Sequence, residues 1–151
     1  MLRQAFTDRL REAMKARDMR TISTVRLIIA GLKDRDIAAR GQGNTEGLSE
    51  AEILRMLHAM VKQRRESIVH FEQGSRADLA EREREEIIII ESFLPWQLDE
   101  GETEAAARAA IAETGAASVR DFGKVMAMLR ERHPGTIDLG RAGTIARRLL
   151  G

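Results

Sequence analysis

Apolar residues recur at helical spacing along nearly the whole chain, and this pattern restricts the fold to one built from helices. Leu2, Phe6, Leu10 and Met14 lie four residues apart, so they form one face of a first helix. Aromatic residues make up 3% of the chain and there are two prolines, a composition that fits a soluble helical protein better than a β-sandwich. Further helices are expected over residues 21–41, 49–74, 78–95, 99–115, 118–133 and 138–150.

Polar residues that cap helices mark where these helices begin. Ser49 followed by Glu52 has the spacing of a capping box, in which each side chain accepts a hydrogen bond from the backbone of the other. Short polar side chains in front of an apolar pattern are typical N-caps. The expected caps of the other helices are Thr21, Asp78, Asp99, Ser118 and Asp138.

The four consecutive isoleucines Ile87–Ile90 fit either a buried strand or a buried helix. No second strand is available to pair with them, and the acids around them keep helical register, so a helix is expected. Pro95 should end that helix, because a proline disfavours helical geometry in the residue before it. We therefore predict an all-α protein with an N-terminal bundle of about four helices in residues 1–95 and a three-helix module in residues 96–151.

Residue types exclude several kinds of chemistry. There is no cysteine, and His58 and His70 lie twelve residues apart on one expected helix, too far to bind one metal ion together. The loop GQGNTEG follows no strand, so it does not predict a nucleotide site. No nucleophile motif or P-loop occurs. We expect no catalytic residues, no metal and no cofactor.

The apolar runs of the chain are shorter than the roughly 20 residues that a membrane-spanning helix needs. The first 18 residues are amphipathic and rich in arginine, as in a mitochondrial presequence. Asp8, Glu12 and Asp18 argue against a presequence, because transit peptides contain few acids. A cytoplasmic protein without a membrane partner is expected.

Charge is distributed unevenly along the sequence. Residues 1–40 contain ten basic and five acidic residues, residues 41–100 contain seven and thirteen, and residues 101–151 contain eight and six. Arg26, Lys33 and Arg40 are seven residues apart and share one face of the second helix. Basic ends around an acidic middle fit either packing within the chain or two basic surfaces for a partner.

Two basic clusters stand out. Arg64, within the KQRRES segment, falls near core spacing, so we expect it to pair with a carboxylate such as Asp78 or Glu86. The second cluster lies in the last 34 residues, where seven basic residues face three acids. Its candidate RNA-binding residues are Arg120 and Lys124, four apart on the sixth helix, and Arg141, Arg147 and Arg148 on the seventh.

These tail cations suit phosphate contacts, which require charge and reach, and no aromatic residue lies among them for base stacking. Recognition of the backbone of a folded RNA is the functional interpretation, and a solvated basic face is the alternative. An adaptor that binds another helical protein, or itself, also fits the segregated charge and the isoleucine run.

Several segments together resemble the GatB/YqeY family over essentially the whole chain. They are KQRRESIVHFEQGSRADLAEREREEIIIIESFLPWQL and DFGKVMAMLRERHPGTIDLGRAGTIARRLL. The resemblance implies an N-terminal helical bundle and a tail module like that at the end of the B subunit of the glutamine-dependent tRNA amidotransferase. It further implies tRNA as a partner, with a translation-related protein as another.

The family's activity label is a carbon–nitrogen ligase with glutamine as amido-N-donor. The catalytic domain of the B subunit and the glutaminase residues have no counterpart in this sequence. An authentic amide-forming enzyme would therefore need its active site from a partner. The resemblance therefore implies that this protein has the binding module of the family and no catalytic activity of its own.

Overall fold

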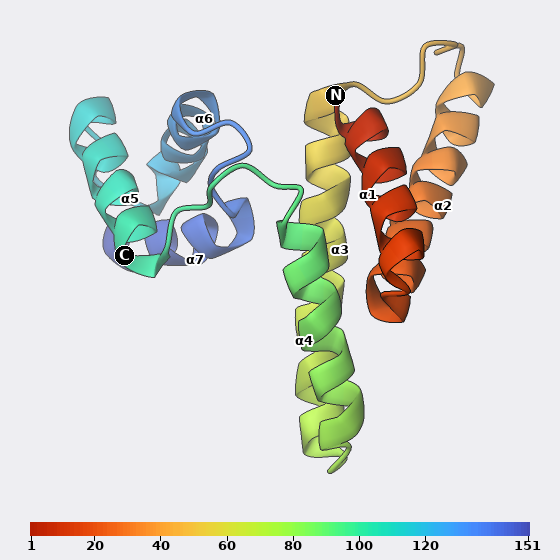
Figure 1. Ribbon diagram of the computed structural model, residues 1–151. Helices are drawn as coiled ribbons and strands as arrows, with labels where there is room; N and C mark the ends of the chain where they lie inside the picture. The colour runs from red at the N-terminus through yellow and green to blue at the C-terminus, as the bar shows by residue number, and fades with distance from the viewer. The chain divides into compact units, whose positions relative to one another are not determined.

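The computed structural model describes residues 1–151 as an all-α protein without strands (Figure 1). The predicted fold class, four helices followed by three, is confirmed. The chain divides into two compact units, Met1–Leu94 and Pro95–Gly151. The helices are α1 (Leu2–Ala16), α2 (Met19–Gly41), α3 (Glu50–Gln73), α4 (Ala77–Glu91), α5 (Glu100–Thr114), α6 (Phe122–Arg132) and α7 (Leu139–Leu150), with a short 3-10 turn η1 (Val119–Asp121) before α6.

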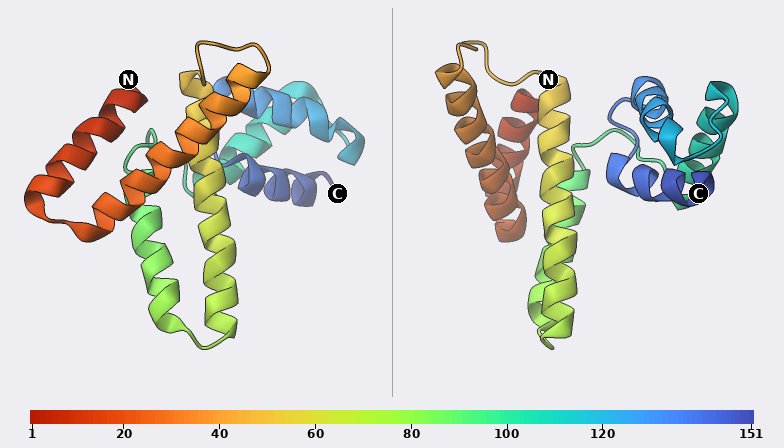
Figure 2. Two further views of the ribbon diagram at one scale, coloured as in Figure 1. Left: turned by 90° about the vertical axis from the view of Figure 1, so that its right-hand side faces the viewer. Right: turned by 180° about the vertical axis from the view of Figure 1, so that it is seen from behind.

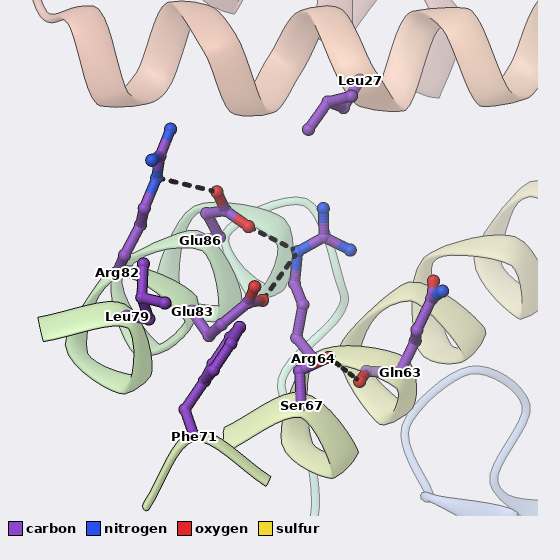
Figure 3. A pocket seen from close by; sticks show the side chains of 9 residues that line it. All are labelled: Leu27, Gln63, Arg64, Ser67, Phe71, Leu79, Arg82, Glu83 and Glu86. Carbon is purple, nitrogen blue, oxygen red and sulfur yellow. Dashed lines mark hydrogen bonds and ion pairs between the residues drawn. The ribbon is translucent and has the colours of Figure 1, made fainter. Parts of the chain in front are cut away.

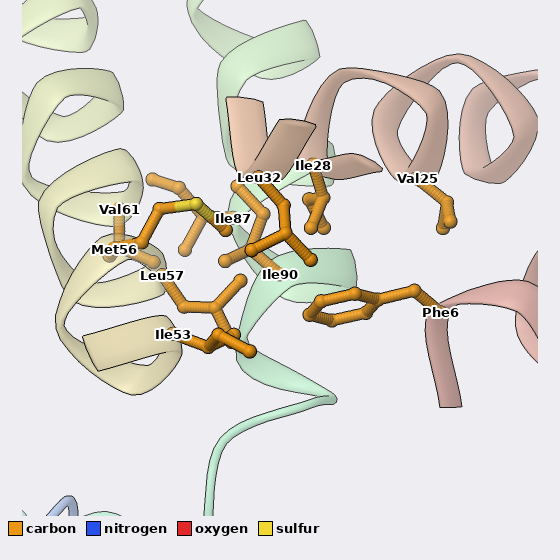
Figure 4. Close-up of a cluster of buried hydrophobic side chains, with 10 residues drawn as sticks. All are labelled: Phe6, Val25, Ile28, Leu32, Ile53, Met56, Leu57, Val61, Ile87 and Ile90. Atoms are coloured by element: carbon orange, nitrogen blue, oxygen red, sulfur yellow. The ribbon is translucent and has the colours of Figure 1, made fainter. Parts of the chain in front are cut away.

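The N-terminal unit consists of two helical hairpins. α1 and α2 pack together, and α3 and α4 form a longer hairpin (Figure 2). One apolar core joins all four helices (Figure 4). The rings of Phe6 and Phe93 meet edge to face, with their centroids 4.9 Å apart. The buried members of this core are Phe6, Val25, Ile28, Leu32, Ile53, Met56, Leu57, Val61, Ile87 and Ile90.

The apolar face of α1 differs from the prediction at its end. Met14 is 52% exposed, whereas Ala13 is buried. Residues four apart on a helix advance by about 40° at each step, so Met14 has rotated about 80° away from Phe6. Ala13, seven residues after Phe6, stays within about 20° of it.

Three predicted caps are wrong. Ser118 caps the turn η1 and not α6, and the helices expected to begin at Thr21 and Asp78 start earlier than predicted. Asp18, not Thr21, caps α2: its side chain accepts the backbone N–H of Thr21, and the Thr21 hydroxyl donates to the same carboxylate. α4 begins at Ala77, after Arg76, and Asp78 lies inside its first turn, where a negative charge also favours a helix N-terminus.

The isoleucine run is helical, as predicted. Ile87 and Ile90 are buried in the core, and Ile88 is 70% exposed. Four consecutive residues of a helix point in directions about 100° apart, so one side of the helix cannot bury all of them.

The C-terminal unit has its own core between α5, α6 and α7. α5 begins with a complete capping box between Asp99 and Glu102 and ends at Gly115, whose φ of 67° favours glycine. Asp138 caps α7 as predicted. The buried core residues are Ala107, Ala110, Val125, Met126, Leu129, Ile137, Ala142, Ile145 and Ala146.

Candidate nucleic-acid interface

The start of α6 and the end of α7 lie together in the C-terminal unit. The ring of Phe122, the first residue of α6, packs against Gly143 of α7, where an added Cβ would lie 3.5 Å from Cζ of the ring. Beside it, the side chain of Val119 lies close to Gly151, the last residue. An antiparallel pairing of α6 and α7 therefore brings the basic residues that begin one helix near those that end the other.

Arg120 lies in the turn η1 rather than on α6. The Ser118 hydroxyl caps this turn by accepting the backbone N–H of Arg120 at 3.3 Å. The Asp121 carboxylate accepts the backbone N–H of Ala117 at 2.9 Å, so the chain does not enter α6 until Phe122. The prediction that Arg120 and Lys124 share one face of one helix is wrong in this respect, although both side chains are exposed.

Lys124 lies in the first turn of α6, where the helix dipole disfavours a positive charge. Asp121 offsets this unfavourable position. Its pKa is lowered, first by the hydrogen bond from the Ala117 backbone and to a smaller extent by the charge of Lys124. No carboxylate lies within ion-pair distance of Lys124, and the residue is exposed to solvent.

Arg147 projects from the last turns of α7 over the ring of Phe122, 4.6 Å from the ring centroid. A cation above an aromatic face at this distance gains about 0.5–1 kcal/mol at an exposed site. The contact holds the guanidinium beside the start of α6, and the residue as a whole stays exposed.

Arg148 is the tail cation that an acid partly neutralises. Its Nη2 lies 3.3 Å from Oε2 of Glu104 on α5, and Glu104 also accepts a hydrogen bond from Arg108 at 2.8 Å. The pKa of Glu104 is lowered, mainly by the hydrogen bond from Arg108 and next by the charge of Arg148. A phosphate would compete with this exposed carboxylate for Arg148.

Arg141 is separated from the other tail cations. It lies half-buried in the first turn of α7, where its backbone N–H donates to Asp138 at 3.1 Å. Seven residues, or about 10 Å of helix, separate it from Arg148. Arg120, Lys124, Arg147 and Arg148 therefore lie toward the end of the α6–α7 pair where α6 begins and α7 ends, and Arg141 lies toward the other end.

The cluster around Arg64 in the N-terminal unit lines a pocket of about 370 Å³ (Figure 3). Arg64 donates from Nε to Oε2 of Glu86 at 2.9 Å, and the side chains of both residues are 11% exposed. The predicted pairing with Glu86 is correct. The alternative with Asp78 is wrong, because Asp78 pairs with Arg76 at 3.2 Å.

Two neighbours of this pair were not expected from the sequence. Nε of Arg82 lies 4.0 Å from Oε1 of Glu86, and a carboxylate oxygen of Glu83 lies 4.0 Å from Nε of Arg64. Burial raises the pKa of Glu83, and the charge of Glu86 raises it further. The alternating charges of helix α4 gave no signal of which acid would turn inward.

None of the helices combines the length and the apolar character needed to cross a membrane. No group of three or more His, Asp or Glu side chains is arranged to hold a metal ion.

Comparison with known proteins identifies relatives in yeasts. The chain is 35% identical over 85 residues to altered inheritance of mitochondria protein 41, mitochondrial, of Lachancea thermotolerans, a match that covers 56% of this chain and 43% of the relative. It is 36% identical over 94 residues to the protein of the same name from Clavispora lusitaniae, covering 60% and 52%. An uncharacterised protein of Schizosaccharomyces pombe is 27% identical over 94 residues, covering 62% and 72%.

The matches to the two mitochondrial relatives thus span about half the length of those proteins. The sequence profile of the family described as Yqey-like protein matches residues 3–150, across both units of the fold. The chain therefore belongs to the Yqey-like protein family.

Proposed function

We propose that the protein is a tRNA-associated binding protein whose C-terminal unit contacts the phosphate backbone of folded RNA. The contact residues are Arg120, Lys124, Arg141, Arg147 and Arg148. One observation carries the proposal: four exposed cations from the turn η1 and the helices α6 and α7 lie toward one end of the α6–α7 pair, and only Arg148 has a carboxylate within ion-pair distance. Phosphate contacts require charge and reach, which this arrangement supplies.

The RNA class rests on the resemblance of the tail segment to the end of the B subunit of the tRNA amidotransferase. Phe122 is covered by Arg147 and Gly143, so it is not free to stack on an unpaired base. Recognition of shape and backbone fits this surface better than recognition of base sequence. A carbon–nitrogen ligase activity with glutamine as amido-N-donor would need a partner to supply the active site.

Binding of unmodified tRNA at increasing salt tests the proposal. Five phosphate contacts contribute about 4 to the magnitude of the slope of log K against log salt, within a factor of two. Between 50 and 200 mM salt a slope of about 4 lowers the affinity about 250-fold. Failure of the protein to bind tRNA at 50 mM salt would refute this function.

A protein-interaction adaptor is the second candidate, and exposed apolar side chains favour it. Ile88 on α4 is 70% exposed, as is Trp96 in the C-terminal unit. An interaction with a protein partner should survive nuclease and high salt and be lost in Ile88→Glu. Loss of all captured protein after nuclease treatment would exclude this candidate.

The cytoplasmic location expected from the sequence also remains a prediction. Relatives named as mitochondrial proteins make the mitochondrion the alternative compartment to test. Fractionation of cells that express the tagged protein from its own gene distinguishes the two locations.

A further inference from the structure

The solvent side of α2 is one continuous exposed ridge. Its residues follow one another at intervals of four and three, the spacing that keeps them on one face of a helix. Every one of them is exposed, from the start of the helix to its last turn. We call this surface the α2 ridge; it consists of Met19, Ser23, Arg26, Ala30, Lys33, Ile37 and Arg40.

Three cations and no acid lie on the α2 ridge. Arg26, Lys33 and Arg40 are seven residues apart, so they are spaced about 10 Å from one another and extend over about 21 Å. Two acids of α2 flank the ridge: Asp34 is exposed and directly follows Lys33, and Asp36 accepts two hydrogen bonds from Arg3 at 2.7 and 2.9 Å. The pKa of Asp36 is lowered mainly by Arg3 and to a small extent by the charge of Arg40. None of the three ridge cations forms an ion pair within 4.0 Å, so the ridge remains more basic than its flanks.

Most other arginines of the N-terminal unit have an acidic partner. Arg20 pairs with Glu85 at 2.9 Å, Arg64 pairs with Glu86, and Arg84 pairs with Glu72. These pairs join α2 to α4 and α3 to α4, so they serve the packing of the unit. The cations of the α2 ridge form no such ion pair, and their exposed side chains can reach an external anion.

The remaining ridge residues restrict what kind of anion fits. Met19 and Ile37 are exposed by 70% and 66%, but they lie 18 residues, or about 27 Å, apart, so they form no apolar stripe for insertion into a membrane. The apolar side of α2 is buried in the core and cannot turn outward. Ser23 and Ala30 are small and leave room for close approach between the cations.

We propose that the α2 ridge is a second phosphate-binding surface, on which Arg26, Lys33 and Arg40 contact the backbone of a nucleic acid. A nucleic-acid backbone supplies a line of regularly spaced anions long enough for all three cations. No aromatic residue lies on the ridge, so these contacts position the RNA and do not read its bases. This inference rests on the proposed function, because it adds a second contact surface for the same RNA ligand.

The test compares tRNA binding by three variants of the full chain. The ridge variant is Arg26→Gln, Lys33→Gln, Arg40→Gln, and its control removes three exposed cations elsewhere in the N-terminal unit, Lys15→Gln, Arg55→Gln, Lys62→Gln. The tail variant is Arg120→Gln, Lys124→Gln, Arg141→Gln, Arg147→Gln, Arg148→Gln. Helical circular dichroism and thermal unfolding establish that each variant is folded.

The ridge variant should reduce the magnitude of the salt slope by about 2–3 and the affinity at 0.1 M salt by about 100- to 500-fold. The control should change the slope by less than about 1. Equal effects of the ridge variant and its control would overturn the inference and leave the proposed function standing. An unchanged tail variant with a weakened ridge variant would refute the proposed tail site and leave the ridge.

Binding of the same variants to vesicles that contain phosphatidylserine is the remaining measurement. If the ridge variant loses binding to these vesicles while its binding of tRNA equals that of the control, the ridge faces an anionic membrane and the inference is wrong. If the wild-type protein binds no tRNA at 50 mM salt, the inference and the proposed function both fail.

Discussion

The ion pair between Arg64 and Glu86 offers a sharp test of how the N-terminal unit is held together. Replacing Arg64 by methionine keeps an unbranched side chain about as long as the arginine stem, removes the guanidinium and leaves the buried Glu86 without its nearest cation. Breaking a fully buried pair costs about 3–5 kcal/mol. Arg82 remains 4.0 Å from Glu86, and both members of the pair are 11% exposed, so we expect about 2–3 kcal/mol.

Hydrogen exchange of the α3 and α4 backbone measures this change in the full chain, without assuming that both units unfold together. A loss of 2–3 kcal/mol corresponds to exchange about 30- to 150-fold faster in these helices. The double variant Arg64→Met, Glu86→Leu should recover most of the loss, because an apolar pair of similar volume replaces a buried ion pair at little cost.

The matched control is Arg9→Met. Arg9 pairs with Glu12 at 3.7 Å, and the two side chains are 42% and 71% exposed, so its loss should cost no more than about 0.5 kcal/mol. If Arg64→Met costs no more than Arg9→Met, the account of a structural, buried Arg64 is wrong.

Three further predictions concern stability and surface chemistry. The pKa of Asp36 is lowered to about 2, mainly by the hydrogen bond from Arg3, so its stabilising contribution is present above pH 4 and is lost as the pH falls through 2. The free energies of unfolding of Asp36→Asn and the wild type should differ by about 1 kcal/mol at pH 5, after allowance for the exposure of Arg3, and by less than about 0.3 kcal/mol at pH 2. A constant difference at both pH values would contradict this linkage. Asp99→Ala removes the α5 capping box and should destabilise the C-terminal unit by about 1 kcal/mol in urea unfolding, whereas Glu100→Ala, next to it, should cost less than half as much. Ile88→Glu should change the melting temperature by less than about 2 °C, because Ile88 faces solvent. Ile90→Ala, in the core, should lower the free energy of unfolding by about 2–5 kcal/mol. Equal losses of stability in the two variants would mean that Ile88 is buried by a partner or a second copy.

The sequence predicts the helices well because their apolar faces repeat over several turns. Positions of helix ends depend on single hydrogen bonds, and there the prediction failed. Thr21 has the chemistry of an N-cap, but Asp18, three residues earlier, competes for the same role and is occupied by the backbone and hydroxyl of Thr21. Which of the two residues caps α2 depends on the residue at which α1 ends, because only two residues separate the two helices.

The sequence predicted that Arg64 would pair with a carboxylate, but it did not decide between Asp78 and Glu86. An arginine at core spacing requires a carboxylate, so the existence of a partner followed from the sequence. The choice between Asp78 and Glu86 depended on the register between α3 and α4, which the sequence alone does not define. Local attraction between Arg76 and Asp78 removed the other candidate.

The candidate RNA site was also predictable only in part from the sequence. Exposure of Arg120, Lys124 and Arg147 follows from the apolar pattern around them. The turn η1, the stacking of Arg147 on Phe122 and the pairing of Arg148 with Glu104 arise from tertiary contacts between α5, α6 and α7. The distance of Arg141 from Arg148 follows from their spacing on α7, whereas the position of Arg147 beside the start of α6 depends on these tertiary contacts.

The salt dependence of tRNA binding by the wild-type protein and the tail variant tests the central claim most directly. Its control removes three other cations of the C-terminal unit, in Arg108→Gln, Arg130→Gln, Arg132→Gln. We predict that the tail variant lowers the magnitude of the log–log slope by about 4 and that the control lowers it by less than about 1. Equal slopes for the wild type and the tail variant would contradict the assignment of the C-terminal unit as an RNA-binding surface.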